Sequence, residues 1–445
     1  MNPIKLKICP IMALVVSGMS ATSAFAAGPA IQGGGSSLVL SALGATSPAY
    51  GEFGLFGSTE GAFTYYPVGS AYGQQAFLNN QPIFLGSGVT GTVHFTNNDA
   101  VLTRAQVTAY YNTGLGTTDG PLIQIPYVVT AVAVPIVNGP IVTSATTPQT
   151  TPGQAHSIAL NDDDLCGIFS GWITDLAQLI NPETRAPYTM RHAPITVVYR
   201  ADSNGTTELL TRHLAAVCTR ANTARGVAFV DSLTFANTMA FPSGLPSNFI
   251  AAWGGGGVRY SLTSLASAGT AAIAYLSPDH TNTYLASQSS VVTSSGALQL
   301  PVASLYNTTD ATYYAPTYSN ATKALSQIPA PADPTDPIAW APFSGSTYNA
   351  LANPLSGYPI SGMSQIILSQ CYADPAVATA IHDFLNNHYT NASYASVIRG
   401  NGLDTVPSNF QTAIVSNFLS NTSGNFLDIG NSSLCGPSSG LFPGR

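Results

Sequence analysis

The stretch Tyr199-Arg-Ala-Asp-Ser-Asn-Gly-Thr-Thr-Glu208 joins two segments with different patterns. It follows an apolar, mostly β-branched run, Ile195–Val198, and precedes a helix-like pattern, Leu209–Leu214. The sequence therefore predicts a strand, a glycine-containing turn and a helix in succession. Other β-like runs alternate with helix-like runs along the chain, which indicates an α/β fold.

The start of this predicted helix has the features of an anion-binding site. Its first N–H groups have no partner within the helix, and the helix dipole adds partial positive charge there. Arg200 lies just before the turn, and Asn204, Thr206 and Thr207 supply hydrogen-bonding side chains. From these residues alone, an ordinary capped helix beside a surface arginine is the alternative interpretation.

A second glycine-rich segment, Gly33-Gly-Gly-Ser-Ser-Leu-Val-Leu40, also runs into an apolar helical pattern, which ends near Gly44. The chain contains no Gly-Lys-Ser/Thr motif, which excludes a nucleotide P-loop. Two anion-binding turns so far apart in the sequence favour a ligand held between two lobes.

The N-terminus is typical of a secretory signal peptide. Lys5 and Lys7 precede an apolar core, Ile8–Val16, and Ala24-Phe-Ala26 is a small-x-small cleavage site. We expect residues 1–26 to be cleaved and the protein to be exported to the periplasm or the extracellular space. No later apolar run is long enough to span a bilayer, so we expect a soluble mature chain.

The mature chain of 419 residues is long for one domain, which predicts two lobes. It keeps four cysteines without CxxC spacing, and this even number predicts two disulfides rather than a metal site. Three connectivities are possible, and free buried cysteines are the alternative. Sequential pairing, Cys166–Cys218 and Cys371–Cys435, would place one disulfide in each lobe.

Charged residues make up only 7% of the chain. After removal of the signal peptide, Lys323 is the sole lysine, and 11 basic against 20 acidic residues leave a formal charge of −9. This balance argues against binding to nucleic acid or to anionic membranes. An anionic ligand would be attracted by local dipoles and one arginine rather than by the field of the whole protein.

Four further segments indicate secondary structure. Ile123–Val137 and Pro359–Ser369 are predicted as buried strands, Pro375–Tyr389 as a helix, and Asp164–Ile180 as an amphipathic segment broken at Gly171-Trp172. We expect largely parallel sheets. The stretch 287–359, rich in Ser, Thr, Pro and Tyr, is expected to be irregular surface structure with short strands.

These motifs resemble the DING proteins, a branch of the PstS-type phosphate-binding proteins that serve bacterial phosphate uptake. The resemblance spans nearly the whole mature chain. Ala30-Ile31-Gln32 differs from the Asp-Ile-Asn that gives the family its name. The matching blocks are Gly33–Leu38, Ile123–Val137, Leu165–Gly171, Tyr199–Leu214, Tyr275–Asp279, Tyr358–Asp374 and Asp428–Cys435.

The family resemblance implies a two-lobed, Venus-flytrap fold of the type 2 periplasmic-binding-protein class, with two crossover segments as its hinge. By similarity, residues 27–128 and 361–445 form lobe 1, and residues 129–360 form lobe 2. The four cysteines then fall two in each lobe. The family also implies inorganic phosphate as ligand, with arsenate as a second candidate, and delivery to an ABC permease. We expect a monomer without cofactor, metal or nucleic acid.

The family's phosphate contacts can be transferred to this chain by position. In the first lobe they are the hydroxyl and backbone of Ser37, the backbone N–H of Leu38, the hydroxyl of Ser70 and the carboxylate of Asp99. In the second lobe they are the side chain of Arg200, position 204, and the donors of Gly205 and Thr206. Asp202 matches a carboxylate that pairs with the arginine.

Position 204 departs from the family, because Asn204 stands where the family has a serine that donates to phosphate. Its amide can still donate but is larger. Asn97 and Asn98 replace the small residues that precede the aspartate, and these departures are compatible with a reshaped pocket, a weaker affinity or a different oxyanion. Asp99 itself favours a ligand that carries a proton, because two acceptors would otherwise face each other. Phosphate has such a proton near neutral pH, whereas sulfate does not.

Two other functions are compatible with the residues. A phosphatase would need a metal cluster or an activated nucleophile. The seven histidines are scattered, Asp162-Asp-Asp164 is interpreted as a loop and helix cap, and the Gly-x-Ser-x-Gly match at 436–440 lacks the strand and helix that the motif requires. We therefore expect no catalytic residues. An adhesive or structural protein that reuses the fold is the remaining alternative, which the two anion-binding turns disfavour.

Overall fold

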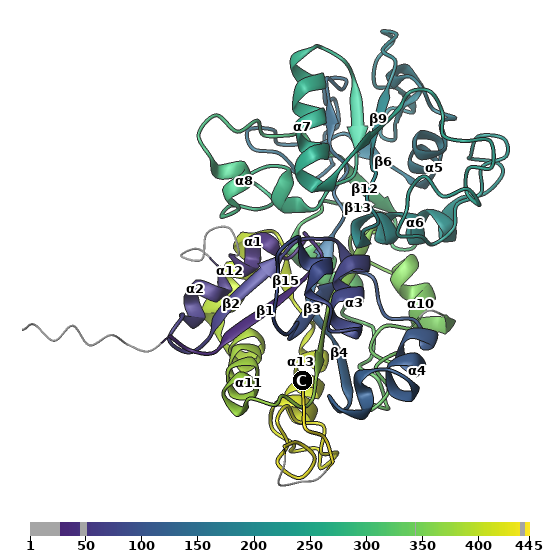
Figure 1. Cartoon of the computed structure of the whole chain (residues 1–445). Helices are drawn as coiled ribbons and strands as arrows, with labels where there is room; N and C mark the ends of the chain where they lie inside the picture. The colour runs from purple at the N-terminus through teal and green to yellow at the C-terminus, as the bar shows by residue number, and fades with distance from the viewer. Residues whose placement is uncertain (1–26, 45–50, 343, 437–440) are drawn as a thin grey trace, which may run out of the picture.

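The computed structural model describes residues 27–44, 51–342, 344–436 and 441–445. The predicted signal peptide, residues 1–26, lies outside the described residues. Figure 1 shows two bodies, each built around its own sheet and joined by chain segments that pass between them. This arrangement confirms the predicted α/β, two-lobed fold.

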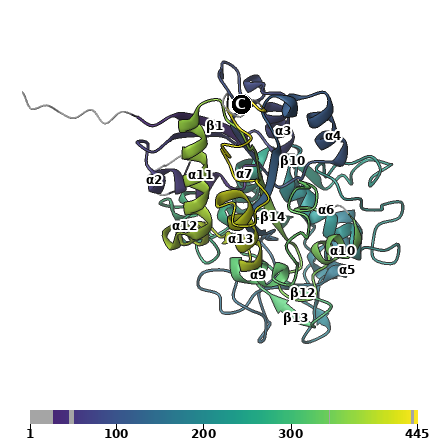
Figure 2. The same ribbon diagram turned by 90° about the horizontal axis from the view of Figure 1, so that it is seen from below.

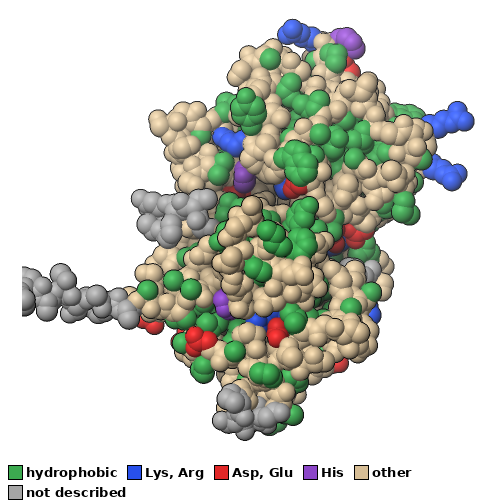
Figure 3. All heavy atoms as spheres, in the orientation of Figure 1, with side chains coloured by type: hydrophobic (Ala, Val, Ile, Leu, Met, Phe, Trp, Pro, Cys, Tyr) green, Lys and Arg blue, Asp and Glu red, His purple; other side chains and the backbone are tan. Residues whose placement is uncertain are grey.

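Charged side chains are sparse on the face shown in Figure 3, which agrees with their small share of the sequence.

The first body contains a six-stranded sheet in the order β15-β4-β14-β3-β1-β2. Its two long central strands, β4 and β14, are buried along their whole length, which explains their nearly continuous apolar runs. The strands are β1 Ala30–Gly35, β2 Ala62–Tyr66, β3 Phe95–Asn98, β4 Leu122–Ala131, β14 Ser361–Ser369 and β15 Asp404–Thr405.

Helices lie on both sides of this sheet. Figure 2 shows β1 and β14 between α11 and α12 on one side and α3 and α4 on the other. The helices of this body are α1 Leu40–Leu43, α2 Glu52–Phe56, α3 Ser70–Leu78, α4 Arg104–Asn112, α9 Tyr318–Leu325, α11 Pro375–Thr390, α12 Ala392–Gly400 and α13 Ser408–Ile414, with short turns η2 Pro82–Leu85 and η3 Leu115–Thr117 and the π-helix η6 Val415–Leu419.

The second body contains a four-stranded sheet in the order β10-β9-β11-β5 and two smaller sheets. Its strands are β5 Ile136–Val137, β6 Ala159–Leu160, β7 Ile180–Asn181, β8 Ala186–Pro187, β9 Thr196–Arg200, β10 Phe249–Ala252, β11 Ala272–Ala274, β12 Ser304–Asn307 and β13 Thr312–Tyr314. Its helices are α5 Asp162–Ser170, α6 Gly205–Val217, α7 Gly254–Ser267, α8 Ser290–Thr293 and α10 Gly345–Ala352, with short turns η4 Leu176–Gln178 and η5 Pro278–His280.

Several secondary-structure predictions made from local sequence patterns were confirmed. β9 is followed by α6 as expected, β14 and α11 form at the predicted places, and α5 ends at Gly171, which has a left-handed φ of 82°. Asp162–Asp164 form the first turn of α5. Both disulfides have the sequential pairing, Cys166–Cys218 and Cys371–Cys435.

Three expectations were wrong. Ile123–Val137 is not one strand: its first part is β4 and its end is β5, because the chain leaves the first sheet after Ala131 and enters the second. The six-stranded sheet is mixed rather than largely parallel, since β14 pairs antiparallel with both β3 and β4, and β15 pairs antiparallel with β4. The four-stranded sheet is largely parallel as expected, since β9 pairs parallel with both β10 and β11. Finally, Gly33–Gly35 belong to β1 rather than to a turn.

For the segment 287–359 we expected irregular surface structure with short strands, and this was only partly right. Its described residues include the short strands β12 and β13 but also three helices, and they bury large side chains such as Trp340 and Leu305. Its helix α9 packs against β4, β14 and β15 of the first sheet. Gln124 Nε2 donates to Pro337 O at 2.8 Å, which ties a further part of this segment to the same sheet. Its polar composition hid these contacts because each is made by a few scattered apolar residues.

No helix in the described parts of the chain is long and apolar enough to cross a membrane.

Candidate functional site

The first-lobe part of the predicted site lies where β1 and β3 end. β1 ends at Gly35, whose φ is 138° and where an added Cβ would lie 2.1 Å from Asn97 O, so only glycine fits there. Ser36 N then donates to Asn97 O at 2.7 Å. Ser37 is half-buried and Leu38 is buried, and α1 begins two residues later. This close pairing brings the loop after β1 beside the loop after β3.

Asp99 is at the centre of this part of the site. It follows β3 directly and is only 2% exposed. Its Oδ2 accepts from Ser36 Oγ at 2.6 Å, and its backbone N–H donates to Ser70 Oγ at 3.3 Å. Among the described residues, its buried Oδ1 has no hydrogen-bond partner. The carboxylate is therefore held in place and has one oxygen available.

Burial raises the pKa of Asp99. The hydrogen bond that Ser36 donates to the carboxylate and the positive charge of Arg200 act in the opposite direction. The ionised form of Asp99 is thus favoured by a serine hydroxyl and by an arginine of the other lobe.

The second-lobe part of the site is the loop between β9 and α6. Arg200, at the end of β9, is 4% exposed, and its Nε donates to Asp202 Oδ1 at 2.8 Å. Its Nη2 forms an ion pair with Asp202 Oδ2. Burial alone would raise the pKa of Asp202, but the hydrogen bonds and charge of Arg200 and the N–H of Gly254 hold it below its ordinary value. The predicted arginine–carboxylate pair is therefore present.

Asn204 is the N-cap of α6 and is 4% exposed. Its Oδ1 accepts from Thr207 N at 2.9 Å. Its Nδ2 donates to Asp202 O at 2.8 Å and to Thr207 Oγ1 at 2.9 Å. Both amide hydrogens are thus engaged within the loop. Leu38 N–H is also engaged, since it donates to Ser36 Oγ at 3.1 Å. Neither predicted donor is directed to a ligand in this arrangement.

The two parts of the site meet at Gly205 and Asp99. A Cβ added to Gly205 would lie 1.8 Å from Asp99 Cβ, so the first residue of α6 packs directly against the aspartate. A Cβ on Gly69, just before Ser70, would lie 3.2 Å from Ser203 O. The structure therefore brings Asp99, Ser70, Ser37 and the start of α6 to one place between the bodies. Thr206, the second residue of α6, is buried there.

A second contact joins the bodies at α1. Ser41 Oγ, one turn beyond the Ser36–Leu38 loop, donates to Asp279 Oδ2 at 2.9 Å. Asp279 belongs to the Tyr275–Asp279 block that carried part of the family resemblance, and its other oxygen accepts from Ser277 Oγ at 2.5 Å. The helix that follows the loop after β1 is thus attached to the second lobe.

Sequence reasoning missed the roles of three residues around Asp99. Ser36 lies in the glycine-rich segment, but its sequence context did not indicate a role. Ser364, on β14, donates to Asn97 Oδ1 at 2.5 Å, and Tyr65 OH donates to Ser36 O at 2.7 Å. No local pattern marks these residues, because they come from strands that only the sheet brings together.

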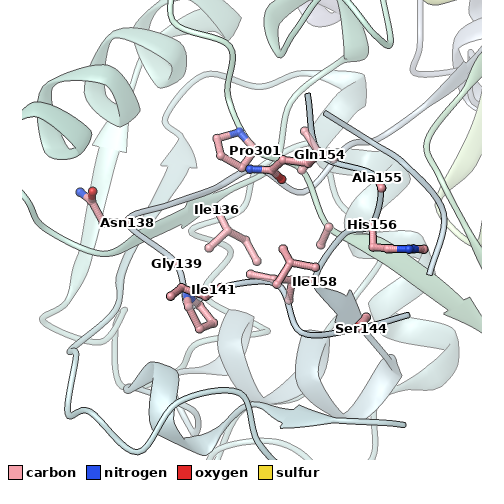
Figure 4. A pocket seen from close by; sticks show the side chains of 14 residues that line it. Ile136, Asn138, Gly139, Ile141, Ser144, Gln154, Ala155, His156, Ile158 and Pro301 are labelled. Atoms are coloured by element: carbon pink, nitrogen blue, oxygen red, sulfur yellow. The ribbon is translucent and has the colours of Figure 1, made fainter. Parts of the chain in front are cut away.

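Two cavities lie outside this contact. A pocket of about 530 Å³ beside β5 is lined mainly by apolar side chains, including Ile136, Ile141 and Ile158, with His156 at one end (Figure 4). It contains none of the predicted ligand residues. A much smaller cavity of about 30 Å³ lies next to Asp99, between Arg212, Gln365 and Trp340, and has room for a molecule the size of water.

Comparisons with known proteins agree with the arrangement of the two bodies. A family model described as the PBP superfamily domain matches residues 20–329. The chain belongs to the PBP superfamily. Among relatives with curated names, alkaline phosphatase L of Pseudomonas aeruginosa is 34% identical over 379 residues, which cover 84% of this chain and 86% of the relative. A phosphate-binding protein from an unknown prokaryotic organism is 34% identical over 382 residues, covering 85% and 93%.

Solved structures of this superfamily extend the comparison. A high affinity periplasmic phosphate-binding protein, PfluDING, bound with phosphate, is 32% identical, with a TM-score of 0.69 over 91% of this chain and 97% of that chain. A DING protein is 31% identical, with a TM-score of 0.70 over 91% and 98%. The phosphate-binding protein from Stenotrophomonas maltophilia is 28% identical, with a TM-score of 0.67 over 92% and 98%. These matches confirm the resemblance to DING-type phosphate-binding proteins.

Proposed function

We propose that this protein is an exported binding protein that captures inorganic phosphate between its two lobes. The observation that carries the proposal is the contact between Asp99 and Gly205, where a buried carboxylate with an unpartnered oxygen faces the start of α6. A helix start supplies N–H donors and partial positive charge, which suit an oxyanion. A carboxylate at the same place suits an oxyanion that still carries a proton.

We assign the ligand contacts accordingly. Ser37 and Ser70 would donate from the first lobe, and Arg200, Gly205 and Thr206 from the second, while Asp99 would accept the proton of the ligand. The Leu38 N–H and the Asn204 amide would donate to the ligand only if they first released their present hydrogen-bond acceptors. By the division that the family implies, lobe 1 would comprise residues 27–128 and 361–445, and lobe 2 residues 129–360, closing about the crossovers between them. The helix α9 and Pro337 depart from this division, because they fall within 129–360 but pack on the first sheet, and we assign them to lobe 1.

The names of the relatives support phosphate binding outside the cytoplasm, and we propose phosphate uptake as its purpose. One solved relative is described as periplasmic, and two disulfides suit an oxidising compartment outside the cytoplasm. The protein would act as a monomer that delivers phosphate to a membrane ABC permease. Arsenate, which matches phosphate in shape and protonation, would bind to the same site.

Calorimetric titration of the phosphate-stripped mature protein with phosphate, arsenate and sulfate tests the proposal. Phosphate and arsenate should bind, and sulfate should bind about 10³-fold more weakly or not at all, because it would leave Asp99 facing an acceptor. Arg200→Gln should weaken phosphate binding at least about tenfold. Arg220→Gln, at an exposed arginine of the same lobe, should leave it unchanged. Absence of both heat and a shift in melting temperature on phosphate addition would refute the proposal.

A phosphatase is the second candidate, because curated relatives at 32–34% identity are named alkaline phosphatase L. Within the described residues, no group of three or more His, Cys, Asp or Glu side chains could hold a metal. Hydrolysis of an aryl phosphate, measured with and without added divalent metals, distinguishes this activity from binding alone. Turnover that is lost in Arg200→Gln and kept in Arg220→Gln would place the activity at the same site.

A further inference from the structure

Ser36, in the loop that follows β1, takes part in four hydrogen bonds. Its hydroxyl donates to Asp99 Oδ2 at 2.6 Å and accepts from Leu38 N at 3.1 Å. Its backbone N–H donates to Asn97 O at 2.7 Å, and its carbonyl accepts from Tyr65 OH at 2.7 Å. The residue is 3% exposed. Its hydroxyl therefore has a single direction, toward Asp99.

The orientation of the Ser36 hydroxyl fixes which oxygen of Asp99 is available to a ligand. Oδ2 is occupied by Ser36, the backbone N–H is held by Ser70, and Cβ packs against Gly205. The carboxylate consequently cannot rotate freely, and Oδ1 is the oxygen that remains available to a ligand. A hydroxyl that donates to a carboxylate favours its ionised form, because only that form accepts at both oxygens.

The charged groups around Asp99 are otherwise largely neutralised by each other. Arg200, from β9, is paired with Asp202, and Arg212, which lines the small cavity beside Asp99, is paired with Glu208 and Asp231. Glu208, on α6, acts on Asp99 as a like charge, and Tyr65 is a buried phenol whose pKa is raised by burial and by Asp99. Ser36 thus supplies the direct side-chain hydrogen bond that offsets the burial of the carboxylate.

We propose that Ser36 is a positioning residue that keeps Asp99 ionised with Oδ1 facing the ligand, and that it thereby sets the discrimination between oxyanions that carry a proton and those that do not. This inference rests on the proposed phosphate-binding function. Ionised Asp99 accepts a proton from phosphate and repels sulfate. Protonated Asp99 instead donates, so it accommodates sulfate, which offers only acceptors. Loss of the Ser36 hydroxyl makes protonation easier and so weakens the rejection of sulfate as the pH falls.

The test compares phosphate and sulfate affinities of wild type, Ser36→Ala, Ser36→Thr and Asp99→Asn between pH 5 and pH 8.5 by calorimetry. Ser36→Ala should lower the phosphate-to-sulfate affinity ratio at pH 5.5 at least tenfold relative to wild type, with a smaller difference at pH 8.5. Ser36→Thr keeps a hydroxyl and should restore the wild-type profile. Asp99→Asn has an amide that always donates, so its sulfate affinity should not depend on pH.

An identical pH profile of the affinity ratio in Ser36→Ala and wild type overturns the inference, even if the variant is less stable. If Ser36→Ala does not fold, Ser36→Cys decides, because a thiol is a weaker donor of similar size and should give an intermediate shift of the profile; a wild-type profile would again overturn the inference. A wild-type protein that binds neither anion refutes the proposed function itself, and that outcome is distinct from failure of the Ser36 inference.

Discussion

Replacing Asn204 with serine should leave phosphate binding intact, although the position lies in the middle of the proposed site. The sequence suggested that the Asn204 amide donates to phosphate. In the structure the amide hydrogens bind Asp202 O and Thr207 Oγ1, and Oδ1 caps α6 through Thr207 N. Asn204 therefore holds the loop rather than the ligand, and its removal should act mainly on stability.

The expected magnitudes follow from these three hydrogen bonds. Serine is as good an N-cap as asparagine, so the cap is kept. The two bonds donated by the amide are lost, and at about 1 kcal/mol each they should lower the free energy of unfolding by about 1–2 kcal/mol. The phosphate affinity should stay within about threefold or increase, because the serine hydroxyl can donate to the ligand. If the amide did donate to phosphate, losing such a charge-assisted bond would cost about 1.5–3 kcal/mol, which is tenfold or more in affinity.

Denaturant unfolding and calorimetric titration with phosphate measure the two quantities separately. Asn161→Ser is a matched control, since Asn161 caps α5 of the same lobe through a 2.9 Å bond from Asp164 N. It should leave both stability and affinity nearly unchanged, because serine keeps the cap and, among the described residues, Asn161 has no amide-donated bonds to lose. A loss of phosphate affinity of tenfold or more in Asn204→Ser would refute the assignment of Asn204 to the loop and would show that its amide turns to the ligand on binding.

Three further predictions concern the contact between the lobes, the buried side chain of Arg445 and the pH dependence of stability. Gly205→Ala should abolish measurable phosphate heat while leaving the circular dichroism spectrum unchanged, because its methyl group would lie 1.8 Å from Asp99 Cβ; wild-type affinity would show that this contact is not made in the bound state. Arg445→Met should lower the free energy of unfolding by about 3–5 kcal/mol, measured by urea unfolding, because it leaves Asp119 buried without its ion pair at 3.0 Å; a change below about 1 kcal/mol would contradict this. Burial raises the pKa of Asp164 to about 7, so the folded protein holds this proton more tightly than the unfolded chain, and stability should fall as the pH rises from about 4 to 7. Asp164→Asn should reduce that fall in urea unfolding at several pH values, and an unchanged slope would contradict the assignment.

Several features could be predicted because their causes are local. The strand β9, its turn and α6 follow from a β-branched run, a capping asparagine and a glycine at the helix start. The end of α5 at Gly171 follows from the left-handed conformation that glycine adopts readily. Arg200 and Asp202 are two residues apart in one loop, so their pairing is also a local property. The family resemblance placed the remaining ligand candidates by position.

Other features depend on partners that are distant in the sequence. The run Ile123–Val137 is equally apolar throughout, and nothing in its composition says that its end leaves the first sheet for the second. Trp340 and α9 are buried by contacts with elements that come before and after them in the chain. Their burial therefore depends on the assembled sheet and not on their own polar surroundings.

By itself, the sequence determined the secondary-structure unit at Tyr199–Glu208, an even number of cysteines in the mature chain suited to two disulfides, and the set of residue types suited to an oxyanion. Only the tertiary structure decided which hydrogen bonds those residues make: Ser36 is directed to Asp99, the Asn204 amide is retained within its own loop, and Gly205 lies against the aspartate. The physical reason is that donors and acceptors in a buried site pair with the nearest partner in space. The order of strands β1, β3 and β14 and the meeting of two lobes set that partner.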